Sequence, residues 1–246
     1  MGSKVSALVW PATVVILAAA VGAAVAGFGH RYGLWNYRMG FTILRWAVYV
    51  AAAAGAVAIA GLVLALVQGA SRLAFVALVG AVVAVGVASP AWNMQRTGAR
   101  VPHIHDITTD TENPPAFVAI APLRKDAPNP AAYDGPKVAA EQKAAYPDIA
   151  PLTLPMPPAQ AFDRALAVAR TMGWRIVAAQ PAEGRIEATD RTFWFGFQDD
   201  IVIRVASTSA GSRIDVRSKS RVGRSDFGTN AKRVRTYLAR LDAYSD

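Results

Sequence analysis

Three long uncharged stretches near the amino terminus constrain this sequence more than any other feature. They run from about Val5 to Gly27, from Trp46 to Val67 and from Leu73 to Ala88. A helix needs roughly 20 apolar residues to cross the hydrocarbon core of a bilayer, so we expect three membrane-spanning helices. The first stretch lacks the cleavage context of a signal peptide and is expected to be retained. Because no ionisable side chain lies inside a stretch, the bundle is not expected to carry a proton relay or an ion path.

Charge is distributed unevenly along the chain. The chain has 26 basic and 17 acidic residues, a net charge of +9, and no acidic residue precedes Pro90. Much of the excess therefore comes from arginines that flank the spans rather than from a basic domain, and we expect no nucleic-acid partner. The absence of cysteine excludes disulfides, thiolate zinc sites and cysteine nucleophiles.

The spans suggest an anchor that also packs on another protein. Small residues four apart permit close helix approach in lipid. They are Gly22 with Ala26, Ala51 with Gly55 and Gly80 with Ala84. We therefore expect the bundle to contact the lipid bilayer and, in addition, either a membrane-protein partner or a second copy of the chain.

Three regions are expected: residues 1–92 as the transmembrane bundle, 93–157 as an extended proline-rich connecting segment, and 158–246 as an α+β domain. Many X-Pro bonds favour extended backbone in the segment, with a short helix near Lys137 to Ala145. Its apolar residues could lay a strip across the domain. These are Ile104, Ile107, Phe117, Val118, Ile120 and Leu123.

The domain is expected to hold a helix, an antiparallel meander of four or five strands, and a final helix, both helices on one sheet face. Helical spacing runs from Pro158 to Gly173 and from about Asn230 to Tyr244. The predicted strands are WRIVAAQ from Trp174, RIEATD from Arg185, TFWFGF from Thr192, DIVIRVAS from Asp200 and SRIDVRS from Ser212. In the third, Phe193, Phe195 and Phe197 would share one face, and Asp199 with Asp200 is predicted to form a hairpin corner.

A polar run, RSKSRVGRSDFGTNAKR, connects the last strand to the last helix. It admits two interpretations. One is a well-capped turn, with its arginines paired inside the molecule to Glu187, Asp190, Asp199 and Asp215. The other is a site for an anion or a partner, in which arginines and helix N-terminal N–H groups face a negative group. The candidate binding residues are Arg217, Ser218, Ser220, Arg221, Arg224, Ser225, Asp226, Asn230 and Arg233.

A second constellation lies in the connecting segment. His103, His105 and Asp106, with Asp110 nearby, are ligand types that suit zinc, iron or manganese. A metal site would need further ligands from elsewhere. The other interpretation is that these side chains hydrogen-bond the segment to the domain, and no cofactor is expected.

Three phrases carry a resemblance to a known family. They are HDITTDTENPPAF from His105, GRIEATDRTFWFGFQDDIVIRV from Gly184 and SRIDVRSKSRVGRSDFGTNAKRVR from Ser212. In this order they resemble the domain-of-unknown-function 1499 family, as a bacterial membrane-anchored member. The resemblance implies no catalytic residue, because no activity is established for the family. It also implies an exported domain, on the periplasmic side of a bacterial inner membrane.

The charge count gives the opposite orientation. Arginines 31, 38, 45, 96 and 100 share one side of the predicted bundle. By the positive-inside rule they would place the large domain in the cytoplasm.

Two classes of function follow from these patterns. We expect a non-catalytic membrane-anchored module that binds a ligand or serves as an accessory or assembly subunit of a membrane complex. The alternative is a metal-assisted hydrolase that uses His103, His105, Asp106 and one of Asp199, Asp200 or Asp226. The sequence contains no GxSxG, glycine-rich phosphate loop or HExxH motif to support other hydrolytic or nucleotide chemistry.

Overall fold

The computed structural model describes residues 2–244, with side chains from residue 4 onwards. The chain divides into two compact units. The first consists of residues 1–96 together with 193–196, and the second holds the remaining residues.

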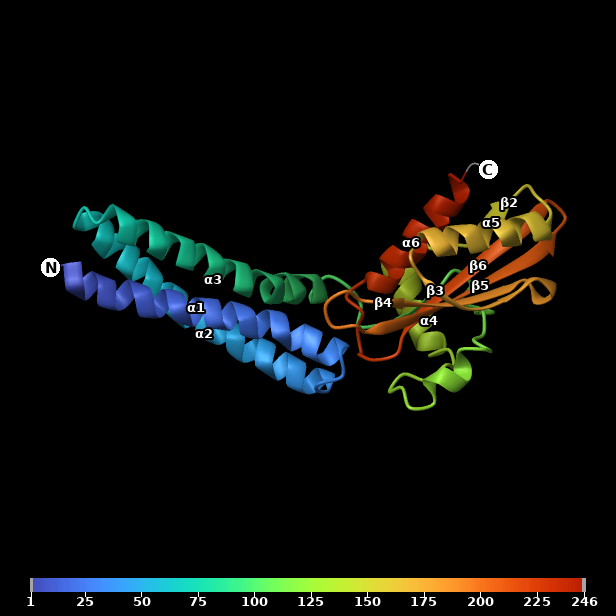
Figure 1. Ribbon diagram of the computed structural model, residues 1–246. Coiled ribbons are helices and arrows are strands. Elements are labelled where there is room, and N and C mark those ends of the chain that lie inside the picture. The colour runs from blue at the N-terminus through green and yellow to red at the C-terminus, as the bar shows by residue number, and fades with distance from the viewer. Residues whose placement is uncertain (1, 245–246) are drawn as a thin grey trace. The chain divides into compact units, whose positions relative to one another are not determined.

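Three long helices make up most of the first unit (Figure 1). They are α1 (Gly2–Arg31), α2 (Tyr37–Val67) and α3 (Ser71–Gly98). Each is long and apolar enough to cross a membrane, which confirms the three predicted spans. The helices extend beyond the apolar stretches because polar residues continue them at the ends. At the start of α2, the side chain of Asn36 caps the helix by accepting the N–H of Met39 at 3.0 Å.

Small residues form the contacts between these helices. Ala51, Ala58 and Ala77 are fully buried. A Cβ on Gly55 would lie only 2.9 Å from the Cβ of Ala84, so α2 and α3 approach closely at this point. Alanine and glycine thus supply the close helix approach that the sequence predicted.

The four residues 193–196 pack against α1 and α2 within the first unit. Trp194 Nε1 donates to the carbonyl of Ala24 at 3.0 Å, and the rings of Phe195 and Phe41 stack with centroids 4.9 Å apart. A Cβ on Gly27 would lie 2.4 Å from the indole, so glycine is what allows the ring to lie on α1. Arg31 Nη1 donates to the carbonyl of Phe193 at 2.7 Å.

The second unit is built on a six-stranded, wholly antiparallel sheet with the order β1-β6-β5-β4-β3, and β2 pairs with β6 as well. The strands are β1 (Asp106–Thr108), β2 (Leu152–Leu154), β3 (Arg175–Gln180), β4 (Arg185–Arg191), β5 (Gln198–Thr208) and β6 (Gly211–Ser220). The helices are α4 (Pro136–Ala145), α5 (Pro158–Thr171) and α6 (Thr229–Asp242), with short 3-10 turns η1 (Ala121–Arg124) and η2 (Pro181–Glu183).

One predicted strand and one predicted hairpin corner were wrong. TFWFGF is not a strand but the turn between β4 and β5, because its aromatic rings pack on α1 and α2 instead of on a sheet. Asp199 and Asp200 do not form a hairpin corner. They lie in β5, opposite Asp190 and Thr189 of β4.

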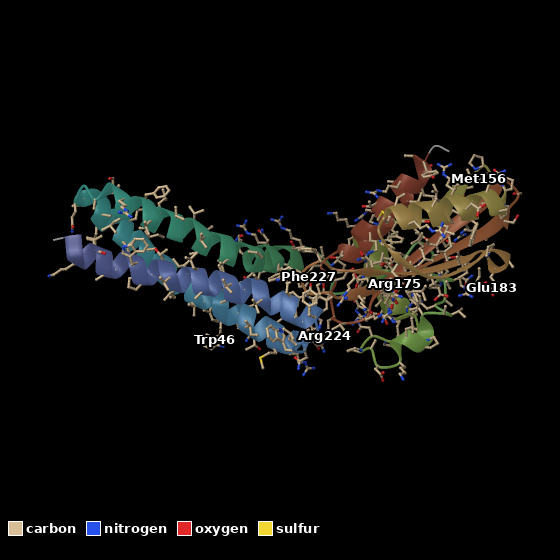
Figure 2. The ribbon with its side chains drawn as sticks, in the orientation of Figure 1. Trp46, Met156, Arg175, Glu183, Arg224 and Phe227 are labelled. Carbon is tan, nitrogen blue, oxygen red and sulfur yellow. The ribbon has the colours of Figure 1, made fainter. Side chains whose placement is uncertain are left out.

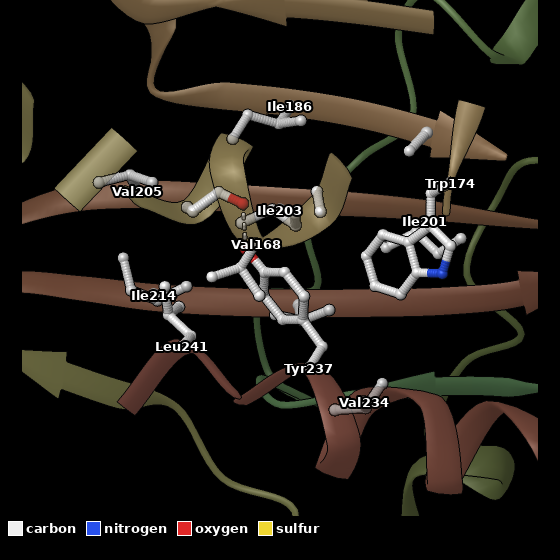
Figure 3. Packing of buried hydrophobic residues seen from close by; sticks show 14 of the residues in the cluster. Val168, Trp174, Ile186, Ile201, Ile203, Val205, Ile214, Val234, Tyr237 and Leu241 are labelled. Atoms are coloured by element: carbon white, nitrogen blue, oxygen red, sulfur yellow. Dashed lines mark hydrogen bonds between the residues drawn. The ribbon is translucent and has the colours of Figure 1, made fainter. Parts of the chain in front are cut away.

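The principal core lies between one face of the sheet and the helices α5 and α6, as predicted (Figures 1 and 3). Ile201, Ile203 and Ile214 of the sheet are fully buried there. Tyr237 of α6 donates its hydroxyl to the carbonyl of Ala165 in α5 at 2.9 Å. Burying each of the three isoleucine side chains stabilises the fold by roughly 1.5–3 kcal/mol.

The opposite face is covered by part of the connecting segment, residues 113–135, which we call the strap. In Figure 1 this green stretch lies across the sheet from α5 and α6. Phe117 and Ile120 of the strap are buried against Val202, whereas Val118 and Leu123 are exposed. The short helix predicted near residues 137–145 is confirmed as α4.

Candidate functional site

The polar run begins on β6, whose alternate residues point to opposite faces of the sheet. Asp215, Arg217 and Lys219 face the strap and are buried. Ser218 and Ser220 face α6. The nine candidate residues are therefore divided among the two faces of β6, the connection that follows it and α6.

Arg217 is held by the strap and by β1. Its Nε and Nη2 donate to the two carboxylate oxygens of Asp106, each at 2.8 Å. Two further N–H groups of its guanidinium donate to carbonyls of the strap at 3.1 and 3.2 Å. The guanidinium also lies 4.9 Å from the ring centre of Phe117 and 5.3 Å from that of Tyr133. Burial raises the pKa of Tyr133 to about 12, so its ring is neutral at physiological pH. The donors of Arg217 thus bind groups of its own domain.

Lys219 lies two residues after Arg217 on the same face of β6 and extends this network of ion pairs. Its Nζ lies 3.1 Å from Asp106 and 2.6 Å from Asp134, and it donates to the carbonyl of Ala132 at 2.7 Å. His105 Nε2 lies 3.2 Å from the second oxygen of Asp134. Two carboxylates therefore face one arginine, one lysine and one histidine.

A second buried carboxylate, Asp200 of β5, joins two more arginines. Arg124 of η1 donates to Asp200 Oδ2 at 2.8 Å, and Arg221 donates to both oxygens at 2.8 and 2.9 Å. Thr189 donates its hydroxyl to Asp200 Oδ1 at 2.8 Å. Arg221 is therefore a structural partner of β5.

Glu187 of β4 binds the strap through backbone groups. Its carboxylate accepts the N–H of Val118, Ala119 and Ile120 at 2.8–3.1 Å, and it also pairs with Arg185. From the sequence, Glu187 is predicted only as a partner of an arginine. The sequence does place Glu187 in an alternating strand. No local pattern, however, predicts that its carboxylate accepts three backbone N–H groups from a segment 67–69 residues away.

On the helix side, four candidate residues come together around Arg233 of α6. The hydroxyl of Ser218 donates to Asn230 Oδ1 at 2.6 Å, and Asn230 Nδ2 donates to Ser220 at 2.9 Å. Arg233 donates to Asp190 at 2.8 Å and to Asp199 at 2.7 Å. These groups tie α6 to β4, β5 and β6.

The connection between β6 and α6 contains an acidic side chain that caps α6. The carboxylate of Asp226 accepts the N–H of Gly228 at 2.8 Å and of Asn230 at 2.7 Å, at the start of α6. Burial raises the pKa of Asp226 above its ordinary value. The helix N-terminus that could receive an external anion is thus occupied by this side chain.

Arg224 and Phe227 are the side chains that the connection exposes (Figure 2). Phe227 is 41% exposed and has a φ of +54°, although it is not glycine. The N–H of Phe227 donates to Ser225 Oγ at 3.2 Å, which helps to hold this conformation. In Figure 2 both side chains lie at the end of the domain opposite Met156 and Glu183.

The histidine constellation does not form a ligand cluster. Asp106 is enclosed by Arg217 and Lys219, and His105 faces Asp134, while His103 is exposed. Within residues 2–244 no group of three or more His, Asp or Glu side chains is arranged to hold a metal ion. The arrangement favours electrostatic cohesion of strap and sheet.

Comparisons with known proteins place the second unit in a family. No curated protein matches significantly. A crystal structure of protein CV1439 from Chromobacterium violaceum matches 39% of this chain and 96% of its own, at 16% identity. Its TM-score of 0.28 supports no structural argument. A family model described as "Protein of unknown function (DUF1499)" matches residues 106–241, more than half of the chain. The region matched includes the strap, the whole sheet and nearly all of α6, and on this ground the chain belongs to the DUF1499 family.

Proposed function

We propose that the chain is a membrane-anchored, non-catalytic module that acts as an accessory or assembly subunit of a membrane complex. The observation that carries this proposal is the internal pairing of the polar run. Arg217, Lys219, Arg221 and Arg233 each neutralise a carboxylate of the same domain, with N–O distances of 2.6–3.1 Å. Charged groups held in this way stiffen a scaffold and are poorly placed to perform chemistry on a substrate.

The first unit supports the partner half of the proposal. Its three helices expose large apolar side chains along their length, including Leu17 of α1, Ile59 of α2 and Phe75 of α3. Surfaces of this kind contact either lipid tails or another transmembrane helix. We propose that one of them contacts a membrane-protein partner or a second copy of the chain.

The proposed location is a bacterial inner membrane with the domain on its periplasmic side. Support for the membrane comes from the three spans. The orientation rests on the family resemblance, against the arginine count at the helix ends.

Site-specific cross-linking in membranes tests the proposal. The chain has no native cysteine, so a photoreactive label can be attached at one position at a time, with Leu17→Cys, Ile59→Cys and Phe75→Cys as one position per helix. We expect at least one position to yield a protein adduct of fixed mass. Ser209→Cys, in the turn between β5 and β6, serves as the control outside the helices. Labelling of lipid alone from all three helices would contradict the partner role.

A further inference from the structure

An open pocket of about 360 Å³ lies within the first unit. Ala20, Ala23 and Ala24 line it from α1, and their spacing puts them on one helix face. Gly86 and Pro90 line it from α3, and Leu44 lines it from α2. Small side chains on two facing helices leave the space that larger residues would fill.

The pocket can take an additional apolar group. A Cβ added at Gly86 would meet no atom within 4 Å. The lining side chains are aliphatic apart from Trp194, whose Nε1–H is already donated to Ala24. Because a stable water molecule needs two or more polar partners, water is a poor occupant of such a space. Its surroundings on membrane-spanning helices offer hydrocarbon instead.

Positive charge gathers at the same end of the helices as the pocket. Arg38 precedes the pocket residue Leu44 by six positions, and Arg96 follows Pro90 by six. Six residues of helix span about 9 Å, so both arginines lie roughly that far along the axis from the pocket. No acidic residue occurs before Asp106. A phosphate at this level would therefore meet no acidic side chain of the first unit.

Trp194 lines the pocket beside α1. The indole is held by its hydrogen bond to Ala24 and by the absence of a side chain at Gly27. An occupant of the pocket would therefore touch the turn between β4 and β5 as well as the helices.

We propose that this pocket binds one acyl chain of an anionic phospholipid, whose phosphate lies among the arginines at the helix ends and whose hydrocarbon contacts Trp194. The bound chain stabilises the docking of the β4–β5 turn on the helices. The pocket thereby makes residues 193–196 sensitive to the lipid composition of the membrane.

Fluorescence quenching of the full chain in nanodiscs tests this proposal. Phosphatidylglycerol with brominated acyl chains is added as a minor component to phosphatidylcholine, and the signal of Trp194 is obtained by subtracting that of Trp194→Phe. We expect brominated phosphatidylglycerol to quench Trp194 more than equally brominated phosphatidylcholine does. Gly86→Leu, which enlarges a pocket-lining position where an added Cβ meets no atom within 4 Å, should abolish the extra quenching.

The matched control is Ala53→Leu, a comparable enlargement at an exposed position of α2. It should leave the quenching unchanged. Native mass spectrometry gives a second readout, with one retained phosphatidylglycerol in the wild type and in Ala53→Leu but not in Gly86→Leu. Equal quenching by the two lipids, or quenching that persists in Gly86→Leu, would show that Trp194 senses only the surrounding bilayer and would overturn the proposal.

Discussion

Removing the Arg217 guanidinium tests whether the polar run serves the interior of the domain. The side chain of Arg217 is 2% exposed and that of Asp106 is 0% exposed. Arg217→Met keeps most of the volume but leaves the Asp106 carboxylate with Lys219 as its remaining cation. Breaking a buried ion pair costs about 3–5 kcal/mol, and the surviving Lys219 contact places this case near the lower end, about 3 kcal/mol. Since 1.4 kcal/mol is a factor of ten, local opening should increase about 100-fold.

Hydrogen–deuterium exchange of the full chain in nanodiscs measures this opening. Amides of the strap and of β1 should exchange faster, because both contact the guanidinium. The matched control is Lys143→Ala, which removes an ion pair to Glu112 whose side chains are 59% and 81% exposed. An exposed pair contributes about 0–1 kcal/mol, so the control should change exchange little.

The double variant Asp106→Leu/Arg217→Met completes the cycle. It leaves no unpaired carboxylate at this position, so we expect its destabilisation to be smaller than the sum of the two single effects. If Arg217→Met changed strap exchange no more than Lys143→Ala does, the buried pair would not hold the strap and the reasoning would be refuted.

Three further predictions concern the packing of Trp194 on α1, the cap of α6 and stability in acid. Gly27→Ala would place a Cβ 2.4 Å from the indole of Trp194, so the Trp194 emission should shift to the red, whereas Gly22→Ala, 3.9 Å from its nearest neighbour, should leave it unchanged; identical spectra would contradict the packing. Asp226→Ala removes the acceptor of two N–H groups and should lower the free energy of unfolding by about 1–2 kcal/mol in urea titrations, while Asp226→Asn, whose single side-chain oxygen can accept one of these two N–H groups, should recover only part of it; equal losses in the two variants would argue against the cap. At Asp110 burial alone would raise the pKa, but N–H groups and two arginines outweigh it and hold the pKa below its ordinary value. Its stabilising contribution is therefore present above the unfolded pKa of about 3.9 and is lost as pH falls through the lower folded pKa. The stability difference between wild type and Asp110→Asn should accordingly shrink on acidification, and a difference that stayed constant with pH would contradict this assignment.

Local periodicity was sufficient to predict the helices and most of the sheet. The spans are long apolar stretches, α5 and α6 repeat apolar residues at helical spacing, and β4, β5 and β6 are at least seven residues long and place apolar residues at alternate positions. In contrast, β1 and β2 have three residues each. Segments this short carry no usable alternation, and their pairing with β6 depends on the tertiary structure.

The aromatic turn shows why alternation can mislead. Phe193, Phe195 and Phe197 alternate as in a strand with one buried face. Two of them do not pack on a sheet face: Phe195 is buried against a ring of α2, and Phe193, which is largely exposed, contacts a ring of α1. An alternating pattern indicates that one face of a segment packs against another surface, but it does not identify that surface.

The polar run could be delimited from the sequence, but most of the partners of its side chains could not be named. Internal pairing of its arginines was one of the open interpretations, and Arg233 does pair with Asp190 and Asp199, whereas Asp215 pairs with Arg213, which precedes the run. The buried pair of Arg217 with Asp106 joins residues 111 positions apart. Only the fold of the strap and β1 against β6 brings them together.

The central claim is that this protein is a non-catalytic membrane subunit whose charges hold its own domain together. Purification of the intact chain in mild detergent, with mass spectrometry and elemental analysis of the same sample, tests it most directly. The account predicts a partner protein or a second copy in fixed ratio and no stoichiometric metal. A solitary chain that carries one metal ion per molecule would contradict it and direct attention to His103, His105 and Asp110.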